Sequence, residues 1–199
     1  MDIDFVEQGH EILELVGGVD TIAKAARTCY RSEGKASPEN DERLVRSLIR
    51  NGHHAMLEFG WMMVKFTTDR AIANELVRHR HLSFAQESTR YVNSSKRGFA
   101  FVLPSGIGVD ARQGMEDRCY KDAQYYSVLI RYGTVPEVAR SVLPLCTAAE
   151  IVAAGNLREW RHVLALRTAP DAHPQMRSLM LPLLEELRER VPVVFEDVG

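Results

Sequence analysis

The sequence predicts a single α+β domain over residues 1–199, and three observations support this fold class. The chain has 199 residues, a length for which one domain with a sizeable core is the default. Its content of 45% hydrophobic and 26% charged residues is ordinary for a globular protein. Signals for many helices alternate with signals for a few strands that no hairpin turn joins, and no repeat or long linker interrupts them.

Strands and helices of the first half follow from local signals. Residues 12–16 and 61–67 are predicted as strands, and the second run is apolar and partly β-branched or aromatic. Asp20 is expected to cap a helix over residues 21–30. Ser37-Pro38 is a good start, and Gly52 a good stop, for a helix over residues 39–51. Capping oxygens at residues 67–69 precede a run rich in Ala, Leu and Glu, which predicts a helix over residues 70–80.

The second half is mostly helical by the same criteria. A long helix is predicted over residues 113–132, closed by Gly133, and a short helix begins at Pro136. Residues 147–154 suit a strand or a helix, and a strand is favoured. Asn156 followed by Glu159 resembles a helix cap and opens a helix that extends to Arg167. The last helix is predicted from residue 174 to about residue 190.

Charge and composition exclude several classes of protein. The formal net charge is -2 and the isoelectric point is about 6.4, which argues against a general binder of nucleic acid or of membrane surfaces. No stretch approaches the roughly 20 apolar residues of a membrane span, and the N-terminus lacks a signal-peptide pattern, so a cytoplasmic protein is expected. The three cysteines are widely spaced and predict neither a disulfide framework nor a zinc site, and no metal is expected.

Residues 78–91 carry the densest group of anion-binding side chains. Three arginines, two histidines, two serines and a threonine lie in this segment, after an apolar, helix-like run. They predict a phosphate-bearing ligand, because arginine and hydroxyl donors fit phosphate oxygens. On a helix, successive residues are separated by about 100°, so Arg78, His79 and Arg80 would splay between two anionic ligands. The alternative is a solvated basic helix end followed by a polar loop, which composition alone favours.

The same segment carries a family resemblance. Arg78 to Ser88 fits the R-H-R-x7-S signature of the flavin-dependent thymidylate synthases, and Arg90-Tyr91 continues it. Further segments resemble that family in the expected order, and together the match covers roughly residues 21–196. These segments are the G-H-x-S-x-x-E-like residues 52–58, the E-x-A-R and L-P elements at residues 137–144, the N-x-R and L-R elements at residues 156–168, and the ending at residues 172–177.

The resemblance implies an enzyme that converts dUMP to dTMP. 5,10-Methylenetetrahydrofolate would supply the carbon, FAD would carry the reducing equivalents, and NADPH would reduce the flavin. The implied fold is the family's curved mixed sheet flanked by helices. The implied assembly is a homotetramer whose active sites are shared between subunits, with dUMP and folate as small-molecule substrates and no nucleic-acid or membrane partner.

Residue roles are carried over by position. Arg167 is the main catalytic candidate, placed over the uracil, where its cation would polarise a carbonyl and stabilise negative charge as C5 becomes nucleophilic. Ser88 is the second candidate; it is assigned to binding and orientation, because no adjacent residues complete a Ser-His-acid triad. The flavin contacts implied are His53, Arg78, His79, Arg80, Gln86, Asn156, Leu157, Arg158 and His162. The dUMP contacts implied are Glu75, Leu76, Val77, Arg78, Gln86, Glu87, Ser88, Thr89, Arg90, Arg140 and Arg167.

Departures from the family pattern and two other classes of function stay open. Phe59, Glu75 and Arg177 stand where other members carry different residues, so the resemblance does not predict loop geometry or rates, although all the named arginines are present. One alternative is a thymidylate synthase that uses Cys146 as nucleophile. The other is a non-catalytic nucleotide- or RNA-binding module built on the Arg78 cluster, which predicts salt-dependent binding of polynucleotide without turnover.

Overall fold

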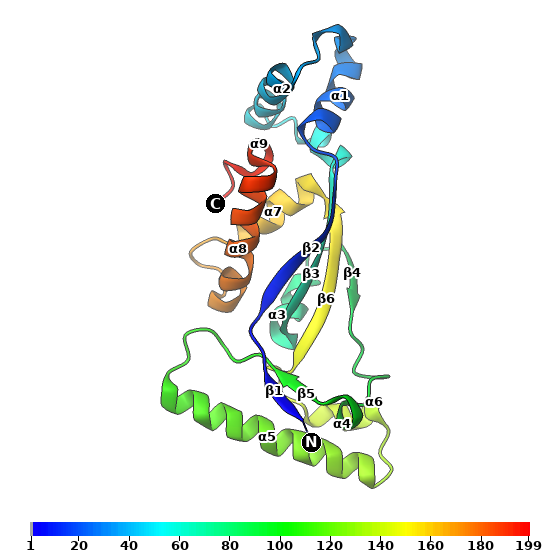
Figure 1. The fold of residues 1–199 in the computed structure, drawn as a ribbon, viewed down its shortest axis with the longest axis vertical. Coiled ribbons are helices and arrows are strands. Elements are labelled where there is room, and N and C mark those ends of the chain that lie inside the picture. The colour runs from blue at the N-terminus through cyan, green and yellow to red at the C-terminus, as the bar shows by residue number, and fades with distance from the viewer. Residues whose placement is uncertain (1) are drawn as a thin grey trace. The chain divides into compact units, whose positions relative to one another are not determined.

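The computed structural model describes residues 2–199 and divides into two compact units, each built from separate stretches of the chain. The first unit comprises the segment that ends at Gly9 together with Phe66–Arg78 and Ala85–Val152. The second unit comprises His10–Lys65, His79–Phe84 and Ala153–Gly199. Figure 1 labels the helices and strands in chain order. Among the described residues, no helix combines the length and the apolar character that a bilayer span requires.

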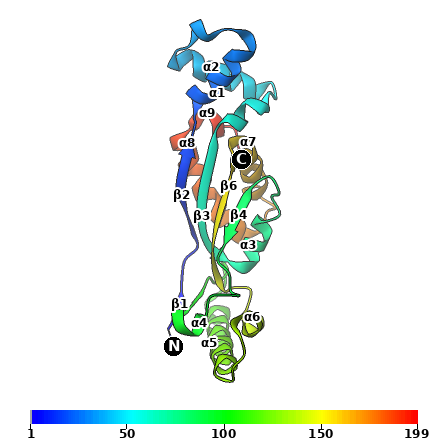
Figure 2. The same cartoon turned by 90° about the vertical axis from the view of Figure 1, so that its right-hand side faces the viewer.

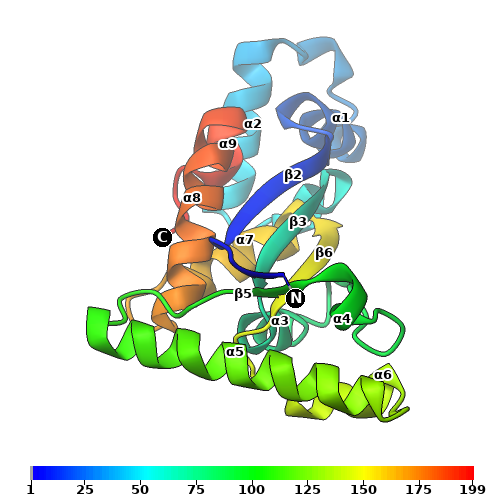
Figure 3. The same ribbon diagram turned by 60° about the horizontal axis from the view of Figure 1, so that its bottom comes forward.

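The first unit is centred on a two-stranded sheet and a long helix. Strand β1 (Ile3–Phe5) pairs in parallel with β5 (Phe99–Phe101), with Ile3 opposite Phe99. Helix α5 (Val109–Arg131) lies along this strand pair (Figure 3). The short helices are α4 (Ser94–Arg97), α6 (Pro136–Ala139) and the 3-10 helix η3 (Arg140–Val142). The buried core between them comprises Phe99, Phe101, Cys119, Ala123, Tyr126, Ala139 and Cys146.

Four strands form the larger sheet, in the order β2 (Gly9–Val16), β3 (Trp61–Asp69), β6 (Ala148–Asn156) and β4 (Ser83–Gln86) (Figure 2). Each of these strands contributes residues to both units. Along β3, Met62, Val64 and Phe66 are fully buried and alternate with more exposed neighbours, as the period of two in a strand requires. Helix α3 (Arg70–Leu76) follows β3, and the Asp69 side chain caps it by accepting from the Ile72 N–H at 2.7 Å.

The second unit holds the remaining helices. Helix α1 (Val19–Tyr30) packs beside α2 (Pro38–Arg50), and α2 contacts the short helix α9 (Pro192–Phe195) (Figure 1). Two 3-10 helices, η1 (Glu33–Lys35) and η2 (His54–Phe59), lie in the connections. Helix α7 (Leu157–Arg167) packs on α8 (Pro174–Arg190). The indole of Trp160 is fully buried and donates to the Met62 carbonyl at 3.1 Å, which anchors α7 to the adjacent end of β3.

Most predictions made from local signals are confirmed. Ser37 caps α2, and Gly52 follows that helix with a φ of 73°, a left-handed conformation that favours glycine. Asn156 caps α7, because its side chain accepts from the Glu159 N–H at 2.9 Å. The ambiguous segment 147–154 is a strand, as favoured. The chain is a mixed α and β protein, as the predicted fold class requires.

Two predictions about helices are wrong. The helix predicted over residues 70–80 ends at Leu76, so Arg78, His79 and Arg80 do not splay around a helix. The chain turns there instead, with the Leu82 N–H donating to the His79 carbonyl, and then enters β4. Asp20 does not cap α1 but lies in its first turn, and the N-cap position belongs to Gly18. The short elements β1, β4, β5 and α9 were not predicted, because three or four residues carry too little periodicity.

Candidate functional site

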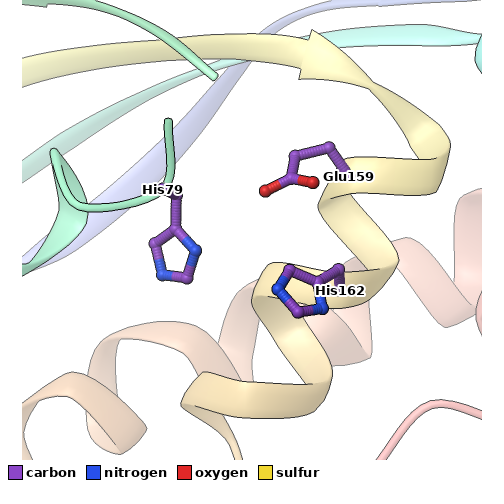
Figure 4. A group of neighbouring side chains, drawn as sticks. All are labelled: His79, Glu159 and His162. Atoms are coloured by element: carbon purple, nitrogen blue, oxygen red, sulfur yellow. The ribbon is translucent and has the colours of Figure 1, made fainter. Parts of the chain in front are cut away.

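In the second unit, His79 and Arg167 meet although 88 positions separate them in the chain. The Nε of Arg167 donates a hydrogen bond to Nε2 of His79 at 2.9 Å. The His79 ring is only 7% exposed, and it stands edge-on to the ring of His162 with the centroids 6.4 Å apart. Figure 4 shows a ring nitrogen of His79 facing the side of Glu159 and His162, both of which project from α7. The structure therefore brings together three predicted site residues and a fourth, Glu159, that had no predicted role in the site.

The protonation state of His79 follows from its surroundings. Burial, and then the positive charges of Arg167 and of His162, lower the pKa of His79 to about 4. The imidazole is therefore neutral near pH 7. Since Nε2 accepts from Arg167, the single ring proton must reside on Nδ1. A neutral histidine acting as an acceptor thus orients the guanidinium of the predicted catalytic arginine.

Helix α7 exposes polar side chains on one face, because the residues of its opposite face are buried in the core. Trp160, Val163 and Leu164 are fully buried, whereas Arg158 and His162 are exposed. Leu157 is also fully buried, and its backbone N–H donates to the Gly60 carbonyl at 2.9 Å. A flavin contact by Leu157 would therefore have to involve its carbonyl oxygen.

A pocket of about 800 Å³ lies within the second unit, in the size range of ligand sites. Two of its lining residues, Arg158 and Glu58, form an ion pair at 2.7 Å, which links α7 to η2. His53 is exposed and is not one of the lining residues; its neighbour His54 lines the pocket instead. The polar and charged lining residues are His54, Glu58, His81, Asn156, Arg158, Glu159, Arg161, His162 and Asp197.

In the first unit, the predicted phosphate-binding side chains gather on the turn after β4. Nη1 of Arg140 donates to Oγ1 of Thr89 at 3.2 Å, across 51 positions in the chain. Oγ of Ser88 accepts from the Arg90 N–H at 3.3 Å. The guanidinium of Arg90 pairs with Glu137 at 3.1 Å. A guanidinium beside a hydroxyl suits an anion, and Glu137 competes with an anion for Arg90.

Gln86 supplies an independent sign of a ligand in the first unit. Its side-chain Nε2 is buried and has no hydrogen-bond partner among the described residues. An unsatisfied buried donor costs about 1–3 kcal/mol, so such a group is expected to meet an acceptor in the functional state. This donor fits a carbonyl or phosphate oxygen, as the predicted flavin and nucleotide contacts of Gln86 require.

The other predicted residues have more ordinary surroundings. Arg78 and Arg80 are exposed, and Val77 is 38% exposed just beyond α3. Leu76 is fully buried in that helix, and the Glu75 carbonyl accepts from the Arg78 N–H at 3.2 Å. The Glu87 N–H donates to the Glu150 carbonyl at 2.9 Å, which extends the edge of β4.

Several residues at these sites had no individual role predicted from the sequence. Glu159 was interpreted only through its place after the helix cap. Glu58 and Glu137 belong to segments quoted for the resemblance, but their arginine partners lie 100 and 47 positions away. Their spacing gave no local signal, so only the folded chain reveals these pairs.

The alternative with Cys146 as nucleophile finds no support in the surroundings of that thiol. Cys146 is 8% exposed, and its Sγ lies 3.5 Å from Sγ of the buried Cys119. Burial raises the pKa of Cys146, and burial followed by the contact with Cys146 raises the pKa of Cys119 to about 12. Both groups are therefore neutral thiols near pH 7, whereas the thiolate is the nucleophile.

Labelling of the native chain with a thiol reagent at pH 7–8 should modify Cys29 rapidly and the other two cysteines slowly. Cys29 is exposed, whereas Cys119 and Cys146 are buried and protonated. Mass spectrometry of the labelled peptides measures the order of reaction, and a Cys29→Ser variant should lose the fast phase. Rapid modification of Cys146 in the folded chain would contradict this assignment and restore the thiolate alternative.

The comparisons with known proteins agree with this class of site. Residues 11–193 match the family described as thymidylate synthase complementing protein. The flavin-dependent thymidylate synthase of Corynebacterium aurimucosum is 33% identical over 193 residues, covering 87% of this chain and 77% of the relative. The flavin-dependent thymidylate synthase of Mycobacterium tuberculosis is 32% identical over 201 residues, covering 91% and 80%. Together with the mixed α and β fold and the two groups of side chains, these relatives define the chain as an enzyme of the thymidylate synthase class.

More particularly, the chain belongs to the flavin-dependent thymidylate synthase family. A solved structure is similar over nearly its whole length: the UMP/dUMP methylase PolB from Streptomyces cacaoi, bound with 5-Br dUMP. The TM-score is 0.84 at 26% sequence identity, and the alignment covers 97% of this chain and 95% of PolB.

Proposed function

We propose that this chain methylates dUMP to dTMP, with carbon from 5,10-methylenetetrahydrofolate, FAD as cofactor and NADPH as the source of electrons. The observation that carries the proposal is the contact of Arg167 with His79. It joins two residues for which the resemblance implies roles at the uracil and at the flavin. The dUMP assignment is supported by the PolB structure with its bound 5-Br dUMP.

Arg167 would act on the uracil as a fixed positive charge. Its guanidinium stays protonated, so it donates hydrogen bonds to a carbonyl oxygen and stabilises negative charge that develops on the ring. His79 holds the Nε side of the guanidinium and so fixes its orientation. Such preorganisation matters because the donor then needs no reorientation during the reaction.

The nucleotide phosphate would bind in the first unit. Arg140 and Thr89 already contact each other, and Ser88 and Arg90 adjoin them in the same turn. Charge-assisted hydrogen bonds from Arg140 would carry most of the affinity, because Arg90 is partly neutralised by Glu137.

FAD, when bound and reduced by NADPH, would supply the hydride that reduces the one-carbon unit from methylenetetrahydrofolate to a methyl group. In the second unit, His79, His162, Arg158 and Asn156 form the donor set proposed to hold it. Asn156, Arg158 and His162 line the pocket of about 800 Å³. The homotetramer with shared active sites and the family's curved mixed sheet are proposed from the resemblance.

A second candidate substrate is UMP. PolB is a UMP/dUMP methylase, and the alignment covers 95% of its length. The two flavin-dependent thymidylate synthases above are covered over 77% and 80% of their lengths, so PolB matches this chain over a larger share of its own length. Measuring kcat/KM for UMP and dUMP side by side separates the two substrates. A preference for UMP would replace dUMP in the proposal and leave the rest unchanged.

The first experiment is a visible spectrum of the purified protein, followed by anaerobic addition of NADPH and dUMP. We expect a yellow protein that NADPH bleaches, and we expect dTMP to form when methylenetetrahydrofolate is supplied. A colourless protein that cannot be reconstituted with FAD would overturn the proposed function.

A further inference from the structure

We propose that His79, Glu159 and His162 form a binding site for a divalent transition-metal ion such as Zn²⁺, and that the ion and the Arg167–His79 contact exclude each other. One ligand atom of each residue lies within 4.8 Å of the others. Two imidazoles and a carboxylate are the ligand set of many zinc sites that keep an open fourth position. The sequence alone predicted no metal.

The three side chains are arranged so that they can close on an ion. Ligand atoms about 2 Å from a tetrahedral zinc lie about 3.3 Å from one another, so ligand atoms that now lie within 4.8 Å of each other must approach by up to about 1.5 Å. His79 is buried and forms the fixed point, whereas Glu159 is half-buried and His162 exposed, so these two can rotate toward it. Figure 4 shows the carboxylate and both rings turned toward a common space.

Access and competition also favour an ion. Glu159 and His162 line the pocket of about 800 Å³, which gives a path from solvent. Within residues 2–199, neither the Glu159 carboxylate nor the His162 ring makes a hydrogen bond or an ion pair that would have to be broken.

The exclusion of Arg167 follows from the tautomers of His79. At present Nε2 of His79 accepts a hydrogen bond from Arg167. If the metal binds Nε2, it takes the same lone pair. If it binds Nδ1, the neutral ring must carry its proton on Nε2, which can then only donate. Whichever nitrogen binds the ion, the guanidinium loses His79 as an acceptor and also meets a new positive charge.

This mechanism predicts inhibition as well as binding, and that consequence depends on the proposed function. Zinc would break the contact between His79 and the arginine assigned to the uracil, and it would occupy two histidines assigned to the flavin. Metal binding itself is measured without turnover, so its failure and the failure of the proposed function are distinguishable.

The test is isothermal titration calorimetry of Zn²⁺ into the flavin-free full chain. The visible absorption spectrum of the chain checks that flavin is absent. Glu159→Gln and His162→Asn should each weaken zinc binding by about tenfold or more, because each removes one of three ligands. Glu58→Gln is the matched control: it alters a carboxylate of the same pocket that pairs with Arg158, and it should bind zinc as the wild type does. Arg167→Ala should bind zinc about tenfold more tightly, since the competing charge-assisted hydrogen bond is gone.

Thermal unfolding without metal identifies any variant that misfolds. If one of the two ligand variants misfolds, zinc binding by the other ligand variant tests the site. If both ligand variants bind zinc as tightly as the wild type, the ion is held elsewhere and the site is wrong. If Arg167→Ala binds no more tightly than the wild type, the mutual exclusion is wrong.

Discussion

Replacing Arg167 by alanine should reduce dTMP formation by at least about 10²–10³-fold in kcat, the loss seen when a preorganised donor to developing negative charge is removed. The side chain is half-buried in the last turn of α7, and its Nε is already held by His79 at 2.9 Å. The guanidinium therefore reaches the reaction with its orientation fixed. Flavin should stay bound, because the proposed flavin contacts lie on other residues.

Arg167→Lys separates charge from geometry. Lysine keeps the positive charge but lacks the planar fork that can bond His79 and a substrate carbonyl together, so only a small part of the activity should return. Arg43→Ala, at an exposed arginine that pairs with Glu39 on α2, is the control for the loss of a cation. The measurements are single-turnover formation of dTMP and the visible flavin spectrum. Turnover near the wild-type rate in Arg167→Ala would remove this residue from the chemistry.

Arg140→Ala should raise KM for dUMP by about 10–100-fold and change kcat little, because a hydrogen bond to a charged group contributes about 1.5–3 kcal/mol. Arg140 lies beside the Thr89 hydroxyl, with Nη1 and Oγ1 3.2 Å apart, and an arginine next to a hydroxyl suits a phosphate. The effect should fall on binding, since the phosphate takes no part in the bond changes at the base.

Glu137→Gln provides the matched contrast for Arg140. This change removes the carboxylate that pairs with Arg90 at 3.1 Å, so Arg90 gains freedom to meet a phosphate and KM should not rise. Deoxyuridine, which lacks the phosphate, should be used equally poorly by the wild type and by Arg140→Ala. An unchanged KM for dUMP in Arg140→Ala would show that the phosphate binds elsewhere.

The sequence by itself determined the features that depend on neighbouring residues. Ser37 before Pro38 and Asn156 before Glu159 cap helices through bonds that span three positions. The apolar, partly β-branched or aromatic run over residues 61–67 specifies a strand. The R-H-R-x7-S signature and the segments that follow it in order identified the family. Each of these signals is local, so no knowledge of the fold was needed to recognise it.

The tertiary structure decided which distant residues meet. Local propensity predicted a helix that extends to residue 80, but the helix ends at Leu76. Beyond it, His79 lies buried against Arg167. The pairs of Arg140 with Thr89 and of Arg158 with Glu58 likewise join separate parts of the sequence. Such contacts depend on how elements pack, and packing overrides local propensity wherever burial stabilises the chain more than a helical turn does.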